Sequence, residues 1–147
     1  VRRARKEPVA GVVAALDLSP HSKVVLEWAA LAASASHLHA YHIYDLPFAA
    51  RLETYGLSHA AIDVYGEQER ARCDAALAAL VAAVDRTGVT SRAVERGDPA
   101  VLLRRYVESV RPSLVVLGKH AGGRRASRVG GVGRFIATSV STDVLLV

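Results

Sequence analysis

The chain has 147 residues and a mass of 15.6 kDa, the size of one compact domain. Hydrophobic residues make up 51% and charged residues 22%, a balance typical of a folded globular protein and not of a disordered one. No apolar run is long enough to span a bilayer, and the single cysteine, Cys73, excludes an internal disulfide and a multi-cysteine zinc site. We expect no secretory signal, because Glu7 and Pro8 follow the basic start, and a lone cysteine fits a reducing, cytoplasmic setting.

The charge is uneven along the chain. The formal total is +5 at pH 7, from 19 basic and 14 acidic residues. Residues 1–8 hold four cations, and six more lie between Ser109 and Thr142, where there is no acid. We interpret residues 1–8 as a basic arm and residues 9–147 as a single domain. The charge favours anionic partners, but no nucleic-acid-binding motif or aromatic stacking array is recognisable, so nucleic acid is a weak candidate.

The first strand and helix are predicted near the start of the domain. Residues 9–16 form a run of small and β-branched apolar residues, typical of a strand buried on both faces of a parallel sheet. Ser19 and Pro20 suit a helix start, as cap and first-turn residue. The apolar residues at helical spacing after them are Val24, Trp28, Leu31 and Ala35.

The same alternation continues to the last residue. Further strands are predicted over residues 38–44, 91–95, 113–117 and 144–147, and further helices over about 58–84, 99–110 and 135–140. The weakly apolar segment 91–95 is expected at a sheet edge, and Asp98 followed by Pro99 suits the start of a helix. The alternation predicts an α/β fold with a parallel sheet and helices on both faces.

Two strand ends carry residues suited to an anionic ligand. Ligands of open α/β sheets lie beyond the carboxyl ends of strands. Asp17 follows the first strand, and Gly118 follows the fourth and opens a loop rich in glycine and arginine over residues 118–134. If these strands are neighbours, Asp17 shares a crevice with glycine amides and with Lys119 and Arg124, a combination that suits a polyphosphate. A solvated surface loop is the alternative interpretation.

Four segments in this order resemble a universal stress protein domain: VVAALDLSPHS from residue 12, GDP from residue 97, LVVLGKH from residue 114 and DVLLV from residue 143. The resemblance covers about residues 9–147. It implies five parallel strands in the order 3-2-1-4-5, a Rossmann-like sheet related to the adenine nucleotide alpha hydrolases, with the first and fourth strands adjacent. It also implies a cytoplasmic homodimer, joined through the final strand at residues 144–147, that acts as a sensor or regulator in the stress response.

Many members of that family bind ATP through Gly-x2-Gly-x9-Gly-Ser/Thr after the fourth strand, and this chain departs from that motif. Ala121 replaces the second glycine, and Gly130 or Gly131 is the third, so Gly131 or Val132 occupies the hydroxyl position. The resulting nucleotide site is predicted at Leu16, Asp17, Ile43, Leu117, Gly118, Lys119, His120, Ala121, Arg124, Gly130, Gly131, Val132 and Gly133. Lys119 and Arg124 are chosen on charge alone. The expected ligand is ATP or another adenine nucleotide, with Mg²⁺ as its companion.

Other functions stay open at this point. The departures from the motif allow a domain that binds no nucleotide and serves as a dimerisation or protein-interaction module. An enzyme is the third hypothesis, and we expect at most slow ATP hydrolysis because no catalytic residue is recognisable. His37 and His39 point to one side of a strand and His42 to the other, which favours structural roles over a metal site. The connection over residues 45–58 suits either a lid over the crevice or a dimer contact.

Overall fold

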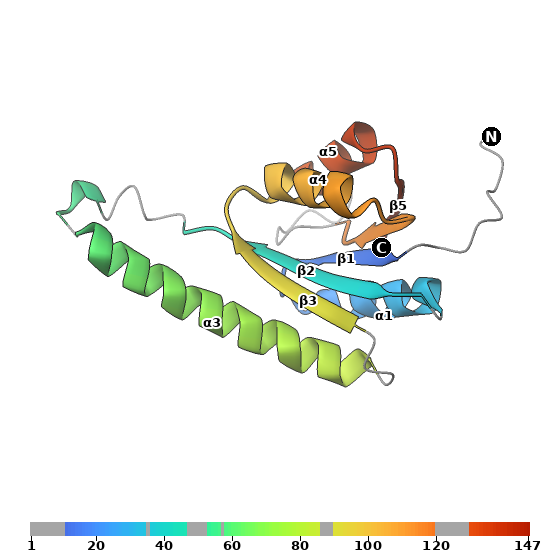
Figure 1. The fold of residues 1–147 in the computed structure, drawn as a ribbon, viewed down its shortest axis with the longest axis horizontal. Helices are drawn as coiled ribbons and strands as arrows, with labels where there is room; N and C mark the ends of the chain where they lie inside the picture. Colours follow the sequence, from blue (N-terminus) through green and yellow to red (C-terminus); the bar gives the residue numbers. More distant parts are fainter. Residues whose placement is uncertain (1–10, 35, 47–52, 57, 86–89, 120–129) are drawn as a thin grey trace.

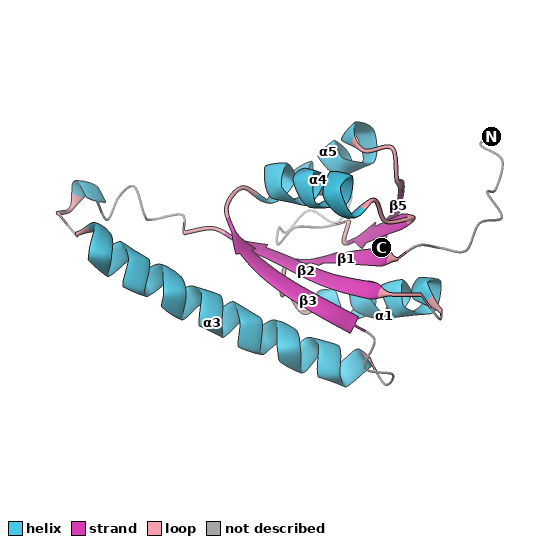
Figure 2. Cartoon of the chain, in the orientation of Figure 1, coloured by secondary structure: helices cyan, strands magenta, loops and turns pink. Residues whose placement is uncertain are grey.

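The computed structural model describes residues 11–34, 36–46, 53–56, 58–85, 90–119 and 130–147 (Figures 1 and 2). The elements are β1 (Val12–Leu16), α1 (Ser22–Ala33), β2 (Leu38–Tyr44), α3 (His59–Val84), β3 (Thr90–Arg96), α4 (Pro99–Val110), β4 (Leu114–Leu117), α5 (Gly131–Ser139) and β5 (Asp143–Leu146). The strands form one parallel sheet in the order β3-β2-β1-β4-β5. This confirms the predicted fold class, including the adjacency of the first and fourth strands.

The sheet is buried on both faces by helices (Figure 1). Helices α1 and α3 cover one face, and α4 and α5 cover the other. The centre of the first layer consists of Val12, Ala14, Leu16, Val25, Leu26, Ala29, Leu77 and Val116. The centre of the second consists of Val13, Tyr41, Leu103, Val107, Val115, Leu117 and Ile136. Successive residues of β1 point to opposite layers, which explains why that strand is apolar throughout.

The first helix differs from its prediction in its start and in its buried face. Ser19 is not the cap: α1 begins at Ser22, and the Ser22 N–H donates to the Ser19 carbonyl at 2.9 Å in the turn before it. Trp28 and Leu31 are 51% and 73% exposed, whereas the buried side chains are Ser22, Val25, Leu26, Ala29 and Ala33. The helix carries two apolar stripes, and the one containing alanines lies against the sheet because small side chains allow the closest approach.

The later elements follow the sequence pattern more closely. Ser58 and Asp98 cap α3 and α4, accepting from the backbone N–H groups of Ala61 at 3.2 Å and Val101 at 2.9 Å. Strand β3 lies at an edge, as expected. Helix α5 begins four residues before the predicted start. The glycines of its first turn have a low helix propensity, so the sequence pattern gives no sign of this turn. Ile136 of this helix is fully buried in the core.

Several sequence predictions lie outside the described residues. These are the arm over residues 1–8, the site residues His120, Ala121 and Arg124, and residues 47–52 and 57 of the connection over residues 45–58. Within the described ranges, no helix is both long and apolar enough to cross a membrane.

Candidate functional site

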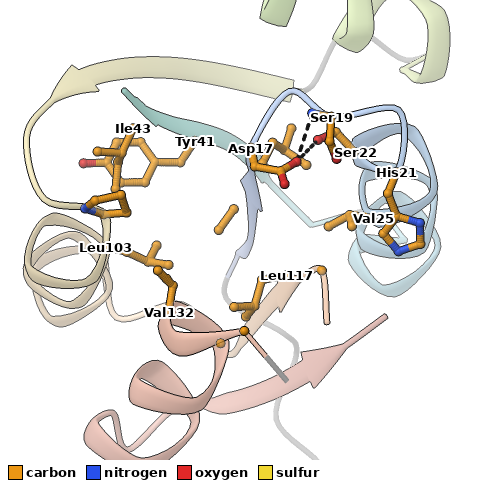
Figure 3. A pocket seen from close by; sticks show the side chains of 16 residues that line it. Asp17, Ser19, His21, Ser22, Val25, Tyr41, Ile43, Leu103, Leu117 and Val132 are labelled. Atoms are coloured by element: carbon orange, nitrogen blue, oxygen red, sulfur yellow. Dashed lines mark hydrogen bonds between the residues drawn. The ribbon is translucent and has the colours of Figure 1, made fainter. Parts of the chain in front are cut away.

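A pocket of about 160 Å³ lies where the carboxyl ends of β1, β2 and β4 meet the starts of α1, α4 and α5 (Figure 3). Parallel strands bring all their carboxyl ends to one edge of the sheet, so this position follows from the topology. The lining residues are Ala15, Leu16, Asp17, Ser19, His21, Ser22, Val25, Tyr41, Ile43, Pro99, Leu103, Leu117, Gly118, Gly130, Val132 and Gly133. Its walls are mainly apolar, with a small polar group set at the β1–α1 turn.

The hollow exists because the middle strand has a small side chain at its end. Ala15 is opposite Tyr41 of β2 and Leu117 of β4 in the strand register. Two large side chains therefore flank a methyl group. Ile43 points to the same face of β2 as Tyr41, two residues along the strand, and also lines the pocket.

The polar side of the pocket is organised around Asp17. Its Oδ1 accepts hydrogen bonds from the Ser19 N–H at 3.0 Å and from the Ser22 hydroxyl at 2.8 Å. Leu18, between Asp17 and Ser19, has a φ of 58°. This left-handed conformation turns the chain sharply enough for Asp17 to reach both donors. Partial burial opposes ionisation, but the hydrogen bonds from Ser19 and Ser22 together outweigh it and lower the pKa of Asp17. The carboxylate is therefore ionised and fixed in orientation at neutral pH.

The opposite side of the pocket is formed by the two ends of the loop after β4. The Gly130 N–H donates to the Lys119 carbonyl at 2.7 Å, and the Lys119 N–H donates to the Val147 carbonyl at 2.8 Å. Helix α5 starts at the next residue, Gly131, and its cap residue Gly130 has no side chain to satisfy the first-turn N–H groups. Those donors suit an anion.

The chain and its fold have counterparts among known proteins. A family model, described as the universal stress protein family, matches residues 11–147. The chain belongs to the universal stress protein family. This confirms the resemblance noted in the sequence. Among curated protein sequences, none matches this universal stress protein.

Solved structures share the fold of this universal stress protein. The hypothetical protein MJ0577 has a TM-score of 0.80 at 12% identity, with 96% of each chain covered. UspA from Lactobacillus plantarum has a TM-score of 0.78 at 16% identity, covering 97% of this chain and 99% of that one. A universal stress protein in complex with cAMP has a TM-score of 0.61 at 20% identity, covering 96% and 98%. At identities of 12–20%, the similarity to these three structures shows a shared fold alone.

Both candidates for the third glycine of the motif lie at the start of α5 in this universal stress protein. Gly130 precedes α5 and Gly131 is its first residue, and residues 120–129 of the spacer lie outside the described residues, so both alignments stay predictions. An added Cβ at Gly131 would meet no atom within 4 Å. A side chain bearing a hydroxyl at Gly131 would therefore enter open space at the start of α5.

The predicted site residues fall into three groups. Those that line the pocket are Leu16, Asp17, Ile43, Leu117, Gly118, Gly130, Val132 and Gly133. Lys119 and Gly131 adjoin it without lining it, and the other three lie outside the described residues. Sequence reasoning missed the lining residues Ala15, Ser19, His21, Ser22, Val25, Tyr41, Pro99 and Leu103. The signal for Tyr41 was present, since it shares a strand face with Ile43.

Tyr41 forms a rigid wall of the pocket. Its ring stacks on Tyr106 of α4 with centroids 4.1 Å apart and an interplanar angle of 16°. Its hydroxyl donates to Glu95 Oε2 at 2.6 Å. Burial and this hydrogen bond to Glu95 raise the pKa of Tyr41, and the phenol stays neutral. A planar ligand would meet a side chain that is already fixed in place.

The histidines of β2 have structural partners. His42 is 6% exposed, and its Nδ1 lies 2.8 Å from the Leu16 carbonyl. His39 Nδ1 lies 2.8 Å from the Ser91 hydroxyl on the other face. In the part of the chain that the structure describes, no three His, Cys, Asp or Glu side chains are grouped as metal ligands would be.

Proposed function

We propose that this universal stress protein binds an adenine nucleotide in the pocket at the carboxyl ends of β1 and β4, and acts as a stress-response sensor or regulator in the cytoplasm. The observation that carries the proposal is the pairing, in one pocket, of an oriented carboxylate at Asp17 with the uncapped first turn of α5. A structural neighbour of the same fold is described in complex with cAMP, which supports a nucleotide as the ligand class.

Each part of a nucleotide has a matching part of the pocket. The apolar wall of Ala15, Tyr41 and Ile43 suits a purine ring. Asp17 Oδ1 already accepts two hydrogen bonds, so Oδ2 is the oxygen that would accept from ribose hydroxyls. Phosphates would lie against Gly118 and the first N–H groups of α5.

The number of carboxylates that line the pocket decides how Mg²⁺ could be held and whether hydrolysis would be assisted. Asp17 is the one carboxylate among the residues that line the pocket. Mg²⁺ accompanying a triphosphate would therefore be held mainly by phosphate oxygens and water. Among the described residues no second carboxylate lines the pocket to position an attacking water, so we propose binding rather than turnover.

Equilibrium binding of labelled ATP at moderate salt tests this function. We expect saturable binding in the micromolar range, lost or greatly weakened in Asp17→Ala. Asp143→Ala is the matched control, because this exposed aspartate is the first residue of β5. It therefore lies at the amino-terminal ends of the parallel strands, whereas the pocket lies at their carboxyl ends. The absence of saturable binding by the folded wild type, or equal binding by Asp17→Ala, would overturn the proposal.

The last strand favours a second activity, association of two copies. Strand β5 pairs with β4 on one side, and Val144, Leu145 and Leu146 are only half-buried. An apolar edge strand of this kind is a surface for pairing with another chain. We propose a homodimer through β5, which would also serve a protein-interaction module that binds no nucleotide. Light scattering should show a dimer that Leu145→Lys dissociates, while the exposed α4 control Val101→Lys leaves it intact.

A further inference from the structure

His21 lies at the start of α1 and lines the pocket (Figure 3). It belongs neither to the glycine motif nor to the hydrogen bonds that hold Asp17. Its Nε2 is 3.2 Å from the carbonyl oxygen of Val147, at the end of the sheet's last strand. A carbonyl oxygen only accepts, so Nε2 must carry a proton in this arrangement. In the neutral ring Nδ1 is therefore the unprotonated nitrogen, and it is the atom that gains a proton when the ring becomes cationic.

The same carbonyl connects His21 to the loop that closes the pocket. Val147 accepts from the Lys119 N–H at 2.8 Å, and the Lys119 carbonyl accepts from Gly130 at 2.7 Å. Val147 thus links the imidazole to Lys119 at the base of the loop, and Lys119 in turn holds Gly130, the residue that precedes α5. This is the side of the pocket that offers backbone N–H groups to an anion.

We propose that His21 recognises the phosphate charge of the bound nucleotide, and that binding takes up a proton from solvent at His21 Nδ1. The proposal rests on nucleotide binding in this pocket. A phosphate beside the imidazole favours its charged form and stabilises the ligand only when that form is present. Nucleotide affinity would then depend on pH near neutrality, through a residue outside the glycine motif.

Charged groups on the elements around this pocket set the size of the effect. Asp17 lines the same pocket and favours a cationic ring, as does the Val147 oxygen at 3.2 Å, whether it belongs to a carbonyl or to a carboxylate. Lys119 after β4 and Arg134 on α5 carry the positive charge that acts against a cationic ring. Lys23, two residues along α1, is paired with Glu27 at 3.9 Å. The uncapped N-terminus of α1 also opposes a cation at His21. A phosphate acts in the same direction as Asp17, so a bound nucleotide would favour the cationic ring further.

The probe is cAMP, because its phosphodiester does not titrate between pH 6 and pH 8 (roughly the range of histidine titration). Adenosine is the control ligand, since it has the base and ribose without phosphate. If the phosphate favours the cationic form of the His21 ring, cAMP should bind several-fold more tightly at pH 6 than at pH 8. Adenosine affinity should change little over this interval.

Two variants identify the residue responsible. His21→Gln keeps a donor for the Val147 carbonyl but cannot titrate, so it should bind cAMP with a flat pH profile. His59→Gln is the matched control, because His59 is an exposed histidine at the start of α3 whose Nδ1 lies 3.5 Å from Glu53 Oε1. It should keep the wild-type profile. Calorimetry in two buffers of different ionisation enthalpy measures the proton uptake directly.

The outcomes separate the inference from the function on which it rests. A cAMP profile that flattens in His21→Gln alone, with proton uptake lost, supports the role of His21. Binding of cAMP and adenosine with the same pH profile in wild type and His21→Gln overturns that role and leaves nucleotide binding intact. Failure of the folded wild type to bind ATP, cAMP and adenosine overturns both.

Discussion

The Gly130 N–H donates to the Lys119 carbonyl at 2.7 Å, so the chain leaves β4 and returns to start α5 at almost the same point. This hydrogen bond fixes Gly118 and Gly130 on the pocket wall by backbone geometry alone. If Gly130 is the third glycine of the motif, the spacer is one residue short, and this hydrogen bond still holds both ends of the loop together. The departure from the motif would then change the chemistry at Gly131 and not the placement of the loop ends.

Restoring a hydroxyl at Gly131 should strengthen the binding of phosphate-bearing ligands. An added Cβ there meets nothing within 4 Å, so Gly131→Ser should fit without strain. One added hydrogen bond contributes about 0.5–1.5 kcal/mol, which is roughly a 2- to 12-fold gain in ATP affinity. Gly131→Ala is the control for the effect of a side chain on helix stability. Equal ATP affinity in the serine and alanine variants would show that no phosphate reaches this position.

Filling the floor of the pocket should abolish binding while the fold persists. Ala15→Leu places a branched side chain between Tyr41 and Leu117, in the space a purine ring would occupy. We expect ATP affinity to fall at least tenfold and stability to fall by about 1–3 kcal/mol through overpacking. Ala79→Leu, on the exposed side of α3, should affect neither quantity strongly. Unchanged affinity in a folded Ala15→Leu protein would place the ligand elsewhere.

The fold was predictable because each element carries a strong local signal. Strand β1 has only small apolar residues, and Asp98 with Pro99 defines the start of α4. The buried face of α1 was not predictable, because Trp28 and Ala29 belong to two apolar stripes and only the distance to the sheet decides between them. The start of α5 was missed because its glycines give no helix signal.

The lining of the candidate pocket was predictable where it depends on backbone and register. Asp17, Ile43 and Gly118 lie at strand ends, whose common edge follows from a parallel sheet. His21 and Leu103 were missed because their positions depend on how α1 and α4 pack across the strand ends. That packing is a tertiary property with no counterpart in local spacing.

The hydroxyl of Ser22 should control the ionisation of Asp17. Ser22 is 2% exposed and donates to Asp17 Oδ1 at 2.8 Å, one of the hydrogen bonds that lower the pKa of Asp17. Ser22→Ala should raise that pKa toward its ordinary value of 3.8. Carboxyl carbon shifts followed by NMR during an acid titration measure it. Ser109→Ala, which removes an exposed helical hydroxyl, should leave the Asp17 titration unchanged.

The same change should alter stability with a definite pH dependence. Because the folded-state pKa of Asp17 is lowered, its ionised form stabilises the fold above pH 3.8, and this contribution is lost as the pH falls through the folded-state pKa. Ser22→Ala should therefore cost about 1 kcal/mol near neutral pH and less in acid. Urea unfolding of the wild type and of Ser22→Ala, once near neutral pH and once below pH 3.8, measures the two costs. A cost that is equal or greater in acid would contradict the assignment.

The turn into α4 should require glycine at position 97. Gly97 has a φ of 150°, and an added Cβ would lie 2.7 Å from Leu102 Cδ1. Gly97→Ala should therefore lower the free energy of unfolding by about 1–3 kcal/mol. Gly131→Ala, which has no such contact, is the control. Urea midpoints of the two variants provide the comparison, and equal midpoints would show that the turn relaxes without cost.

An amide NMR titration of the ¹⁵N-labelled protein with ATP tests whether the nucleotide lies in this pocket. We expect saturable shift changes at the amides of Gly118 and of Gly131 to Gly133, together with those of Asp17, Leu18, Ser19, His21 and Ser22. Changes confined to the far side of the sheet, around Arg70 and Arg92 between α3 and β3, or no changes at millimolar ATP, would contradict it.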